Sequence, residues 1–388
     1  MKRYISSILI IVVSILSIGT YYAQVTSYAS NLPELTFKTV EGDERELHSI
    51  ILNGYYEEGN LSESFSVDSG KTTYQKERSF FERLDGHINP TFERLEKEYR
   101  SFMRGKQYFD TYYEDEDNLT FVTTKMNEDN SKFYPKFYID SLEKKDKEVK
   151  SFEIDLPDQD KYDDIVIRDV QFAQSKLQII TQNDLMKNEG KVEIHHYTID
   201  LAGKKVVNDE TILSETFDSS NQGHFAMPSK VDGKPNNVFV IALVKGSYSE
   251  EGEFTEKVGA SSLFSYHYDK KTLEKIKLPK DLAITYENME SYFSYDEENL
   301  YMTGLEEERS RIFTFDLEKQ KLINEFNLNA VDFAEIKDGR IFVMTADELL
   351  IADALTGKTL YKAKLGLESD DQKKDKNPII QLYDVYIK

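Results

Sequence analysis

The sequence predicts an all-β fold, a β-propeller of four-stranded antiparallel blades with one short inserted α-helix. The first observation is a pattern that returns five times: an aromatic or apolar strand, an Asp, a polar turn and a second strand. The second is another hairpin before each copy, with a tight polar turn and a β-branched apolar strand. Four strands in a unit of this size are typical of a propeller blade.

Each unit is expected to contain strands A to D in order. The A strands are predicted at 107–113, 165–172, 223–228, 289–295 and 330–336, and the B strands at 119–124, 177–182, 238–244, 300–305 and 341–346. The C and D strands with their turns are predicted at 137–154, 195–213, 264–278, 313–328 and 349–365. The repeated Asp residues are Asp140, Asp200, Asp269, Asp316 and Asp353. Each is expected to accept backbone N–H bonds across the turn from strand C to strand D.

The two ends of the chain are expected to supply a sixth blade. Strand-like runs lie at 35–40, 47–56, 62–67 and 71–77, and another lies at 379–387. Pairing of the last strand with the first ones would close the ring and remove exposed strand edges. Seven blades, or an N-terminal strand cap on a five-bladed ring, are the alternatives.

A helix is predicted between the N-terminal strands and the first repeat. Asn89 is the candidate N-cap, Pro90 suits the first turn, and Gly105 suits the position after the end. An apolar stripe runs along it, through Phe92, Leu95, Tyr99, Phe102 and Met103. The stripe indicates packing against the propeller, with a groove for a partner helix as the alternative.

The N-terminus is typical of an exported protein. Lys2 and Arg3 precede an apolar run from Tyr4 to Ile18, and small residues stand at Ser27 and Ala29. This favours a signal peptide or an uncleaved membrane anchor in 1–29, and either would place 30–388 outside the cytoplasm. Residues 30–106 are then expected to complete the propeller, and 107–388 to hold the five further blades and the closing strand.

Composition limits the partners. The chain has no Cys, so neither disulfides nor a lipidated N-terminal Cys are expected. Beyond residue 29 the chain carries 47 Lys and Arg against 71 Asp and Glu, a net charge of −24. A surface of this charge repels phosphate backbones and excludes nucleic acid as the expected partner.

Candidate binding residues lie in long polar loops expected at one end of the blades. These are the B–C loops 125–132, 183–191 and 245–261 and the D–A connections 157–164, 214–223 and 279–288. They carry Tyr162, Tyr248, Phe254 and Tyr286 in an acidic setting, which suits a cationic or polyhydroxylated partner. Arg168 and His224, on predicted A strands, are candidates to line the central channel.

Catalytic and metal signals are weak. Asp158, Asp160, Asp163 and Asp164 offer oxygen ligands for Ca²⁺, but their spacing departs from the EF-hand pattern. No Ser lies in a G-x-S-x-G elbow, and no His has metal-ligand spacing. Adjacent His195 and His196 on a strand are expected to point to opposite faces. No catalytic residue and no cofactor other than Ca²⁺ is therefore predicted.

With Phe315-Asp316-Leu317 and the run Asp353 to Lys358 (DALTGK), the chain resembles the broad WD40/PQQ-like superfamily of bacterial extracytoplasmic β-propellers over residues 107–367. The resemblance implies a circular array of blades with a ligand or partner surface at one end. The chain has no Trp, which argues against a quinone cofactor, and it lacks the WD dipeptide and the Gly-His of WD40 repeats.

Two functional hypotheses follow. The first is a non-enzymatic binding, sensor or accessory protein at the cell envelope, which meets a protein or a cell-wall component through the long-loop face and is secreted or held at the membrane by its N-terminal segment. The alternative is a metal-dependent propeller hydrolase or lyase with its site at the channel mouth.

Overall fold

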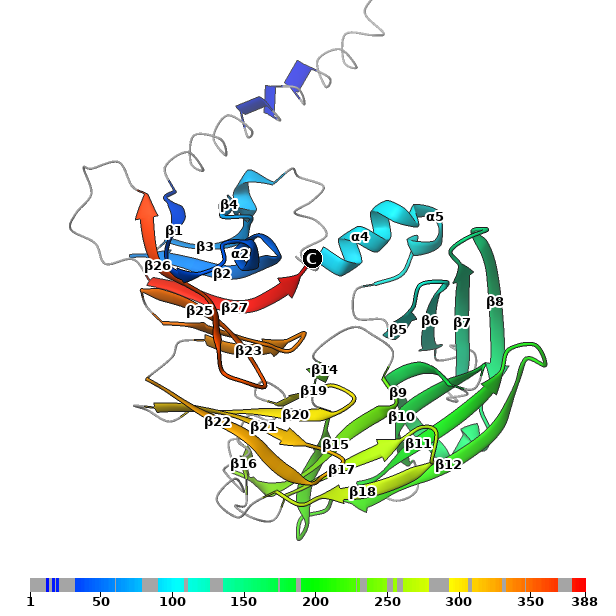
Figure 1. Ribbon diagram of the computed structural model, residues 1–388. Helices are drawn as coiled ribbons and strands as arrows, with labels where there is room; N and C mark the ends of the chain where they lie inside the picture. The colour runs from blue at the N-terminus through cyan, green and yellow to red at the C-terminus, as the bar shows by residue number, and fades with distance from the viewer. Residues whose placement is uncertain are drawn as a thin grey trace, which may run out of the picture. The chain divides into compact units, whose positions relative to one another are not determined.

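The computed structural model of the chain is shown in Figure 1. It describes residues 12–13, 16–17, 19–20, 32–59, 61–78, 90–107, 111–125, 135–173, 175–185, 190–227, 229–230, 236–249, 254–256, 261–278, 293–305, 309–329, 333–345, 347–368 and 379–388. The predicted leader, 1–29, lies outside this set except for six residues, all helical. Within the described set, none of the helices combines the length and the apolar character that a membrane crossing needs.

The strands of the described residues form six sheets, which we name blades 1 to 6. Blade 1 contains β2 (Ile50–Glu58), β3 (Leu61–Asp68), β4 (Lys71–Tyr74) and β27 (Ile379–Ile387). Blade 2 contains β5 (Thr111–Glu114), β6 (Asn118–Lys125), β7 (Lys136–Glu143) and β8 (Glu148–Asp155). Blade 3 contains β9 (Tyr162–Ala173), β10 (Lys176–Leu185), β11 (Lys191–Asp200) and β12 (Lys205–Thr216).

The other three blades each carry an added strand. Blade 4 contains β13 (Gln222–Ala226), β15 (Val238–Tyr248), β17 (Ser262–His267) and β18 (Thr272–Ile276), with β16 (Phe254–Glu256) added to β15. Blade 5 contains β19 (Phe293–Tyr295), β20 (Asn299–Leu305), β21 (Arg309–Asp316) and β22 (Lys321–Asn329), with β14 (Ser229–Lys230) parallel to β19. Blade 6 contains β23 (Phe333–Lys337), β24 (Arg340–Met344), β25 (Glu348–Asp353) and β26 (Thr359–Glu368), with β1 (Glu34–Gly42) beside β26.

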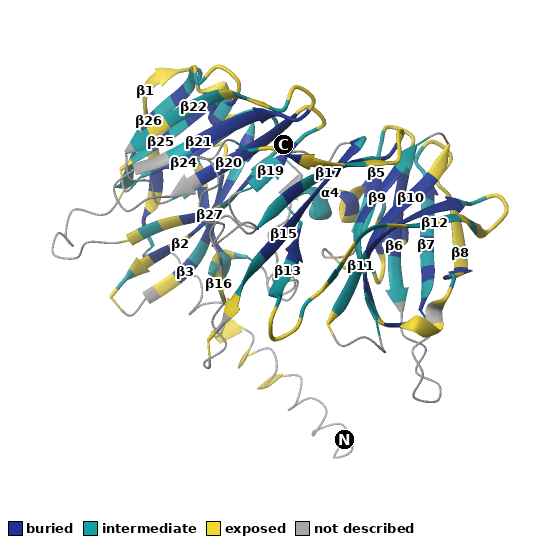
Figure 2. Ribbon diagram, turned by 90° about the horizontal axis from the view of Figure 1, so that it is seen from below, coloured by how far each residue is buried: buried dark blue, intermediate teal, exposed yellow. Residues whose placement is uncertain are grey.

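These sheets confirm the predicted fold class, an all-β propeller of four-stranded antiparallel blades, and six is the number of blades among the described residues. The second strand is the most buried one in blades 2, 4, 5 and 6, as its apolar sequence predicts, whereas β10 and β11 of blade 3 are buried alike. Residues 238–244 of β15 are all buried, whereas β8, the last strand of blade 2, is mostly exposed (Figure 2). A period-two alternation of burial is seen in β7 and β12, and it is absent from the continuously buried part of β15.

Contacts divide the chain into two compact units. Unit 1, Met1–Arg94 and Asn329–Lys388, holds blades 1 and 6, and unit 2, Leu95–Leu328, holds blades 2 to 5. In unit 1 the C-terminal strand β27 pairs with β2, so the two ends of the chain share blade 1, as expected. The strand predicted at 35–40 differs from expectation: β1 pairs with β26 and becomes the fifth strand of blade 6. This pairing supplies hydrogen-bond partners to what would be an edge strand.

Unit 1 has one apolar core between its two blades. Phe65 and Leu52 of blade 1 lie in the same buried cluster as Phe342 and Tyr361 of blade 6. A partly buried ion-pair group lies beside this core, because Lys337 Nζ lies 2.6 Å from Glu335 Oε1 and 2.8 Å from Asp384 Oδ1. The group joins β23 to β27 and so fixes the closing strand against blade 6.

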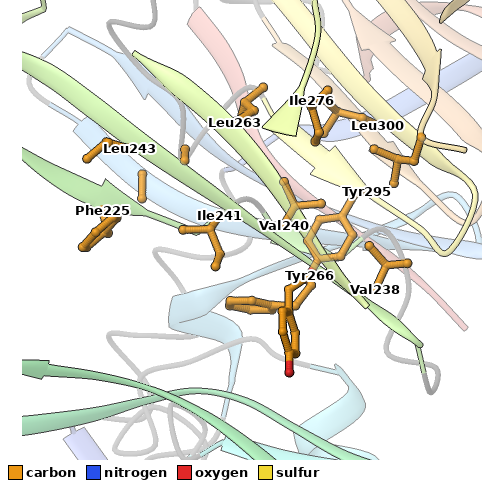
Figure 3. Close-up of a cluster of buried hydrophobic side chains, with 14 of the residues drawn as sticks. Phe225, Val238, Val240, Ile241, Leu243, Leu263, Tyr266, Ile276, Tyr295 and Leu300 are labelled. Atoms are coloured by element: carbon orange, nitrogen blue, oxygen red, sulfur yellow. The ribbon is translucent and has the colours of Figure 1, made fainter. Parts of the chain in front are cut away.

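In unit 2 each blade packs on the next one in the chain. Blades 2 and 3 share a cluster that includes Ile139 and Ile179. Blades 3, 4 and 5 share a second cluster, which includes Ile180, Val240 and Leu300 (Figure 3). The middle strands thus bury side chains on both faces, and this is why their sequences are continuously apolar.

The C–D turns match the prediction at Asp316 and Asp353 but not at Asp140. Asp316 Oδ1 accepts a bond from the Lys319 N–H at 2.7 Å, and Asp353 Oδ1 accepts one from the Thr356 N–H at 2.7 Å, as expected. Asp140 does not do this. It lies inside β7, opposite Ser151, and the turn follows three residues after it. The first copy of the Asp pattern was therefore aligned wrongly, because strand β7 continues to Glu143.

The segment between blades 1 and 2 contains two helices where a single helix was predicted. It contains α4 (Pro90–Glu98) and α5 (Arg100–Met103), separated by Tyr99 at φ −125°, ψ 40°. Gly105 follows with φ +82°, as a C-terminal Gly should. Leu95, Phe102 and Met103 are buried, so the predicted stripe is an inward-facing one, while the predicted cap Asn89 lies outside the described residues. Further short helices are α2 (Arg45–His48) and the 3₁₀ turns η1 (Gln75–Glu77) and η2 (Gln159–Lys161).

Candidate functional site

The long-loop end of blades 3 and 4 contains a structured projection. The segment 245–261 was expected to be a loop, but β15 continues to Tyr248 and pairs with β16. Gly246 pairs with Gln222 of β13 on one side and with Glu256 of β16 on the other, so β16 continues the line of β17. A two-stranded hairpin therefore extends blade 4 beyond its core.

This hairpin brings together two of the predicted binding residues. Tyr248 and Phe254 are direct cross-strand partners in the β15–β16 ladder, although their side chains are outside the described set. Tyr286, the third aromatic predicted for this end, lies outside the described residues.

The D–A connection beside the hairpin is held in place by Lys245. Lys245 Nζ lies 2.8 Å from Asn221 Oδ1 and 3.2 Å from Glu215 Oε1, and only 17% of its side chain is exposed. It also lies 5.4 Å from the centroid of the Phe217 ring. The connection between blades 3 and 4 is therefore fixed to the base of the hairpin. Sequence reasoning missed Lys245 because a single Lys at a strand end gives no signal of its own.

The turn of this connection is built by Asp218. Its Oδ1 accepts bonds from the Ser220 N–H at 2.7 Å and the Asn221 N–H at 2.9 Å. The Ser220 side-chain and backbone bonds hold the pKa of the Asp218 carboxyl below its usual range. The turn thus keeps an ionised carboxylate on the surface at neutral pH.

A second group of polar residues lies on one face of blade 3 near the same end. Asp184 of β10 is the direct partner of Asp164 on β9. Burial raises the pKa of Asp184; a bond from Gln182 opposes the rise, and Asp164 adds to it. Arg168, at a β-bulge in β9, donates to Gln182 Oε1 at 2.7 Å. The charge of Arg168 also acts on Asp184, where it opposes the rise in the pKa of that carboxyl.

The four predicted metal ligands do not converge. Asp158, with φ +52°, pairs with Lys161, while Asp160 and Asp163 are exposed. Asp164 accepts a bond from the Ile165 N–H at 2.8 Å. Across the described ranges, no three carboxylate or imidazole groups are placed as a metal ion would require.

Tyr162, predicted as a surface binding residue, is instead part of the core between blades 2 and 3. Strand β9 begins at this residue, which turns its ring inward, and its hydroxyl lies 3.3 Å from His195 Nε2. His195 Nδ1 lies 2.7 Å from Asp209 Oδ1, and its Nε2 lies 3.1 Å from Glu193 Oε2.

His196 points to the opposite face of the strand, as the sequence predicted. Its Nε2 lies 2.7 Å from Gln178 Oε1, and its Nδ1 lies 2.7 Å from the Tyr266 hydroxyl. Burial lowers the pKa of His196 to about 4, so the ring is neutral at pH 7. Since the amide oxygen accepts, Nε2 holds the proton and Tyr266 donates to Nδ1. This closed network joins blades 3 and 4 and has a structural role.

His224, the remaining predicted channel residue, lies on β13 opposite Val244 and is partly buried. Arg168 and His224 both lie on the first strand of their blades, β9 and β13, as predicted.

The chain was compared with known proteins. No protein-family model matches it, and no curated protein matches it. Among solved structures it is similar to the polysaccharide lyase Uly1 (TM-score 0.37, 12% identity), over 68% of this chain and 58% of the lyase. It is also similar to TolB from Acinetobacter baumannii (TM-score 0.31, 9% identity), over 87% of this chain and 67% of TolB. A third similar structure is the Dos1 propeller (TM-score 0.29, 9% identity), over 68% of this chain and 74% of that one. The alignment thus spans less than two thirds of the lyase, and similarity at these scores carries no statement about activity.

Proposed function

We propose that this protein is an exported or membrane-anchored β-propeller of the cell envelope that binds a protein or cell-wall component without catalysing a reaction. The observation that carries the proposal is the fixed end of blades 3 and 4. There the β15–β16 hairpin projects from the sheet, and Lys245 ties its base to Glu215 and Asn221. A rigid scaffold that presents a structured projection is a common basis for binding.

The charges at this end indicate the chemistry of the partner. Asp160, Asp163 and Asp218 are exposed carboxylates. Neighbouring cations are already paired, because Lys161 contacts Asp158 and Lys191 contacts Glu193. The end of the two blades therefore presents an excess of negative charge, which favours a partner with basic or hydrogen-bond-donating groups.

Site-specific photo-crosslinking in intact cells tests the proposed surface. A crosslinking amino acid is placed at Thr255 or Ser220, which are exposed at the loop end, and at Glu116 or Glu297, exposed in A–B turns, as matched controls. We expect one discrete adduct from the loop-end positions and none from the turns. The same adducts from both sets, or none from Thr255 and Ser220, would contradict the proposal.

The proposed location is tested separately. The sequence of 1–29 supports export, and intact mass analysis of the protein from washed membranes and from culture medium distinguishes a chain that begins at residue 30 from an anchored full-length chain. Recovery of the full-length chain in the cytosolic fraction alone would refute export.

The metal-dependent hydrolase or lyase remains the alternative function, and no specific contact among the described residues favours it. Thermal unfolding in excess Ca²⁺ and in EDTA separates the two hypotheses, because a metal that binds the native state must raise its stability. A rise of Tm with Ca²⁺ that is abolished by Asp164→Asn would favour the alternative.

A further inference from the structure

Blade 2 contains a cleft on one face of its sheet. It has a volume of about 610 Å³. Its floor is the face of blade 2 that points away from blade 3, and its wall is the segment 104–107 that follows α5. Small-molecule sites have volumes of about 300–1,000 Å³, so the cleft has the size of a ligand site. It lies on blade 2, whereas the β15–β16 hairpin belongs to blade 4, so a ligand site here is independent of the proposed function.

The floor is a regular array set by strand register. One row across the sheet is Phe121, Asp140 and Ser151, and the next is Thr123, Tyr138 and Glu153. Residues two apart on a strand share a face, so all six side chains line the cleft. The alternate residues Val122 and Ile139 point to the other face and belong to the core with blade 3.

The Asp140 carboxylate is held in place at the centre of this array. Ser151 Oγ donates to its Oδ1 at 2.6 Å, and Lys106 Nζ donates to its Oδ2 at 3.0 Å. Lys106 is itself 11% exposed, bonds the Phe102 carbonyl at 2.8 Å and lies 4.1 Å from the Phe102 ring centroid. Asp140 nevertheless remains 43% exposed, so a ligand in the cleft can reach its carboxylate.

The lining selects among ligand classes. An anion would meet Asp140 and Glu153, and a cation would meet Lys106 and Arg104, so the mixture of charges favours a neutral ligand. A purely apolar ligand would remove water from these groups without replacing its hydrogen bonds. A ligand with many hydroxyl groups can donate to the carboxylates, accept from Arg104 and Gln107, and lay its C–H face on Tyr138.

We propose that the cleft of blade 2 binds a neutral saccharide, with Tyr138 as its platform and Asp140 as its central hydrogen-bond acceptor. The Tyr138 ring covers the apolar face of such a ligand, and the charged groups of Lys106 and Asp140 orient its hydroxyls. Lys106 is then a positioning residue that acts through Asp140.

Binding of defined oligosaccharides to the full chain tests the proposal. The probes are neutral gluco-, chito- and manno-oligosaccharides of two to four units, an acidic uronate oligomer and a tri-lysine peptide, measured by calorimetry and saturation-transfer NMR. We expect at least one neutral oligosaccharide to bind. Tyr138→Ala and Asp140→Asn should each weaken it about tenfold or more, which corresponds to about 1.4 kcal/mol.

The control is Tyr383→Ala, which removes an exposed aromatic side chain in unit 1. It should leave the affinity unchanged, and the thermal midpoints of all variants show whether they fold. Equal affinities for Tyr138→Ala and Tyr383→Ala overturn the placement of the site. Tighter binding of the uronate oligomer or the peptide than of every neutral sugar overturns the ligand class, and no binding by the unmodified chain at millimolar concentration overturns the proposal as a whole.

Discussion

Blades 2 and 3 pack on each other in unit 2, and both carry ionisable groups, but they use them differently. In blade 3 the groups are enclosed: His196 is 0% exposed, with hydrogen-bond partners for both ring nitrogens. In blade 2 the Asp140 carboxylate is held by two partners and still faces a cleft. A buried polar side chain whose hydrogen-bonding atoms have partners within the protein therefore indicates a structural role. A polar side chain that is held by its neighbours and is still exposed to a cleft indicates a binding site.

The largest expected effect is on the enclosed network. His196→Ala should lower the free energy of unfolding by about 3–5 kcal/mol, because it leaves a cavity and removes a partner from both Gln178 and Tyr266. Urea unfolding measures the loss. The control His267→Ala, at a partly exposed His of blade 4, should cost less than about 1 kcal/mol. If both variants lost the same free energy of unfolding, the burial of His196 would not explain its contribution to stability.

The pH dependence of stability follows from the same residue. The folded-state pKa of His196 is about 4, below its ordinary value of 6.5, so between these values the unfolded chain binds the proton and the folded chain does not. Stability contributed by the neutral ring is present above pH 6.5 and is lost as the pH falls toward 4, by up to about 3 kcal/mol. His196→Gln should remove this part of the slope in unfolding measurements from pH 7 to 4, and an unchanged slope would refute the assignment.

A smaller effect on stability is expected for the Asp residues in the C–D turns, and Asp140, which lies within strand β7, should differ from them. Asp316→Ala removes the acceptor of the Lys319 N–H and should cost about 1 kcal/mol of stability. Asp353→Ala should behave alike, because its carboxylate bonds the Thr356 N–H. Asp140→Ala should instead leave the turn of blade 2 intact, which hydrogen exchange of residues 144–148 reports. Faster exchange of these residues in the variant would show that Asp140 stabilises the turn after all.

The smallest effect concerns the turn of blade 2 itself. Lys147 has φ +56° in that turn and is exposed. Lys147→Gly should stabilise the protein by up to about 1 kcal/mol, since Gly adopts this conformation without steric cost. Thermal unfolding measures the gain, and Lys145→Gly, two residues earlier in the same turn and without positive φ, is the control that should not stabilise.

The fold could be predicted from the sequence because hairpin patterns are local. The apolar B strands and the turns after Asp316 and Asp353 follow from residues close together in the chain. The position of β1 could not be predicted, because its pairing with β26 joins residues more than 300 positions apart and both edges of a blade offer the same hydrogen bonds.

The candidate binding sites were harder to predict because they also depend on residues that are far apart in the chain. Tyr162 follows an acidic run that is typical of a loop, yet β9 begins there and buries it. The cleft brings together strands β6, β7 and β8 and the segment after α5, so it depends on strand register, which sequence alone does not give. One signal was present: Tyr138 and Asp140 alternate with the apolar Phe137 and Ile139, which predicts one open face.

Hydrogen–deuterium exchange of the full chain, with and without the neutral oligosaccharide that binds best, tests the contrast between the two blades most directly. The account predicts protection in residues 104–107 and in β7 and β8, with β10 and β11 of blade 3 unchanged. Protection confined to the β15–β16 hairpin, or protection of β10 and β11 with none in blade 2, would contradict it.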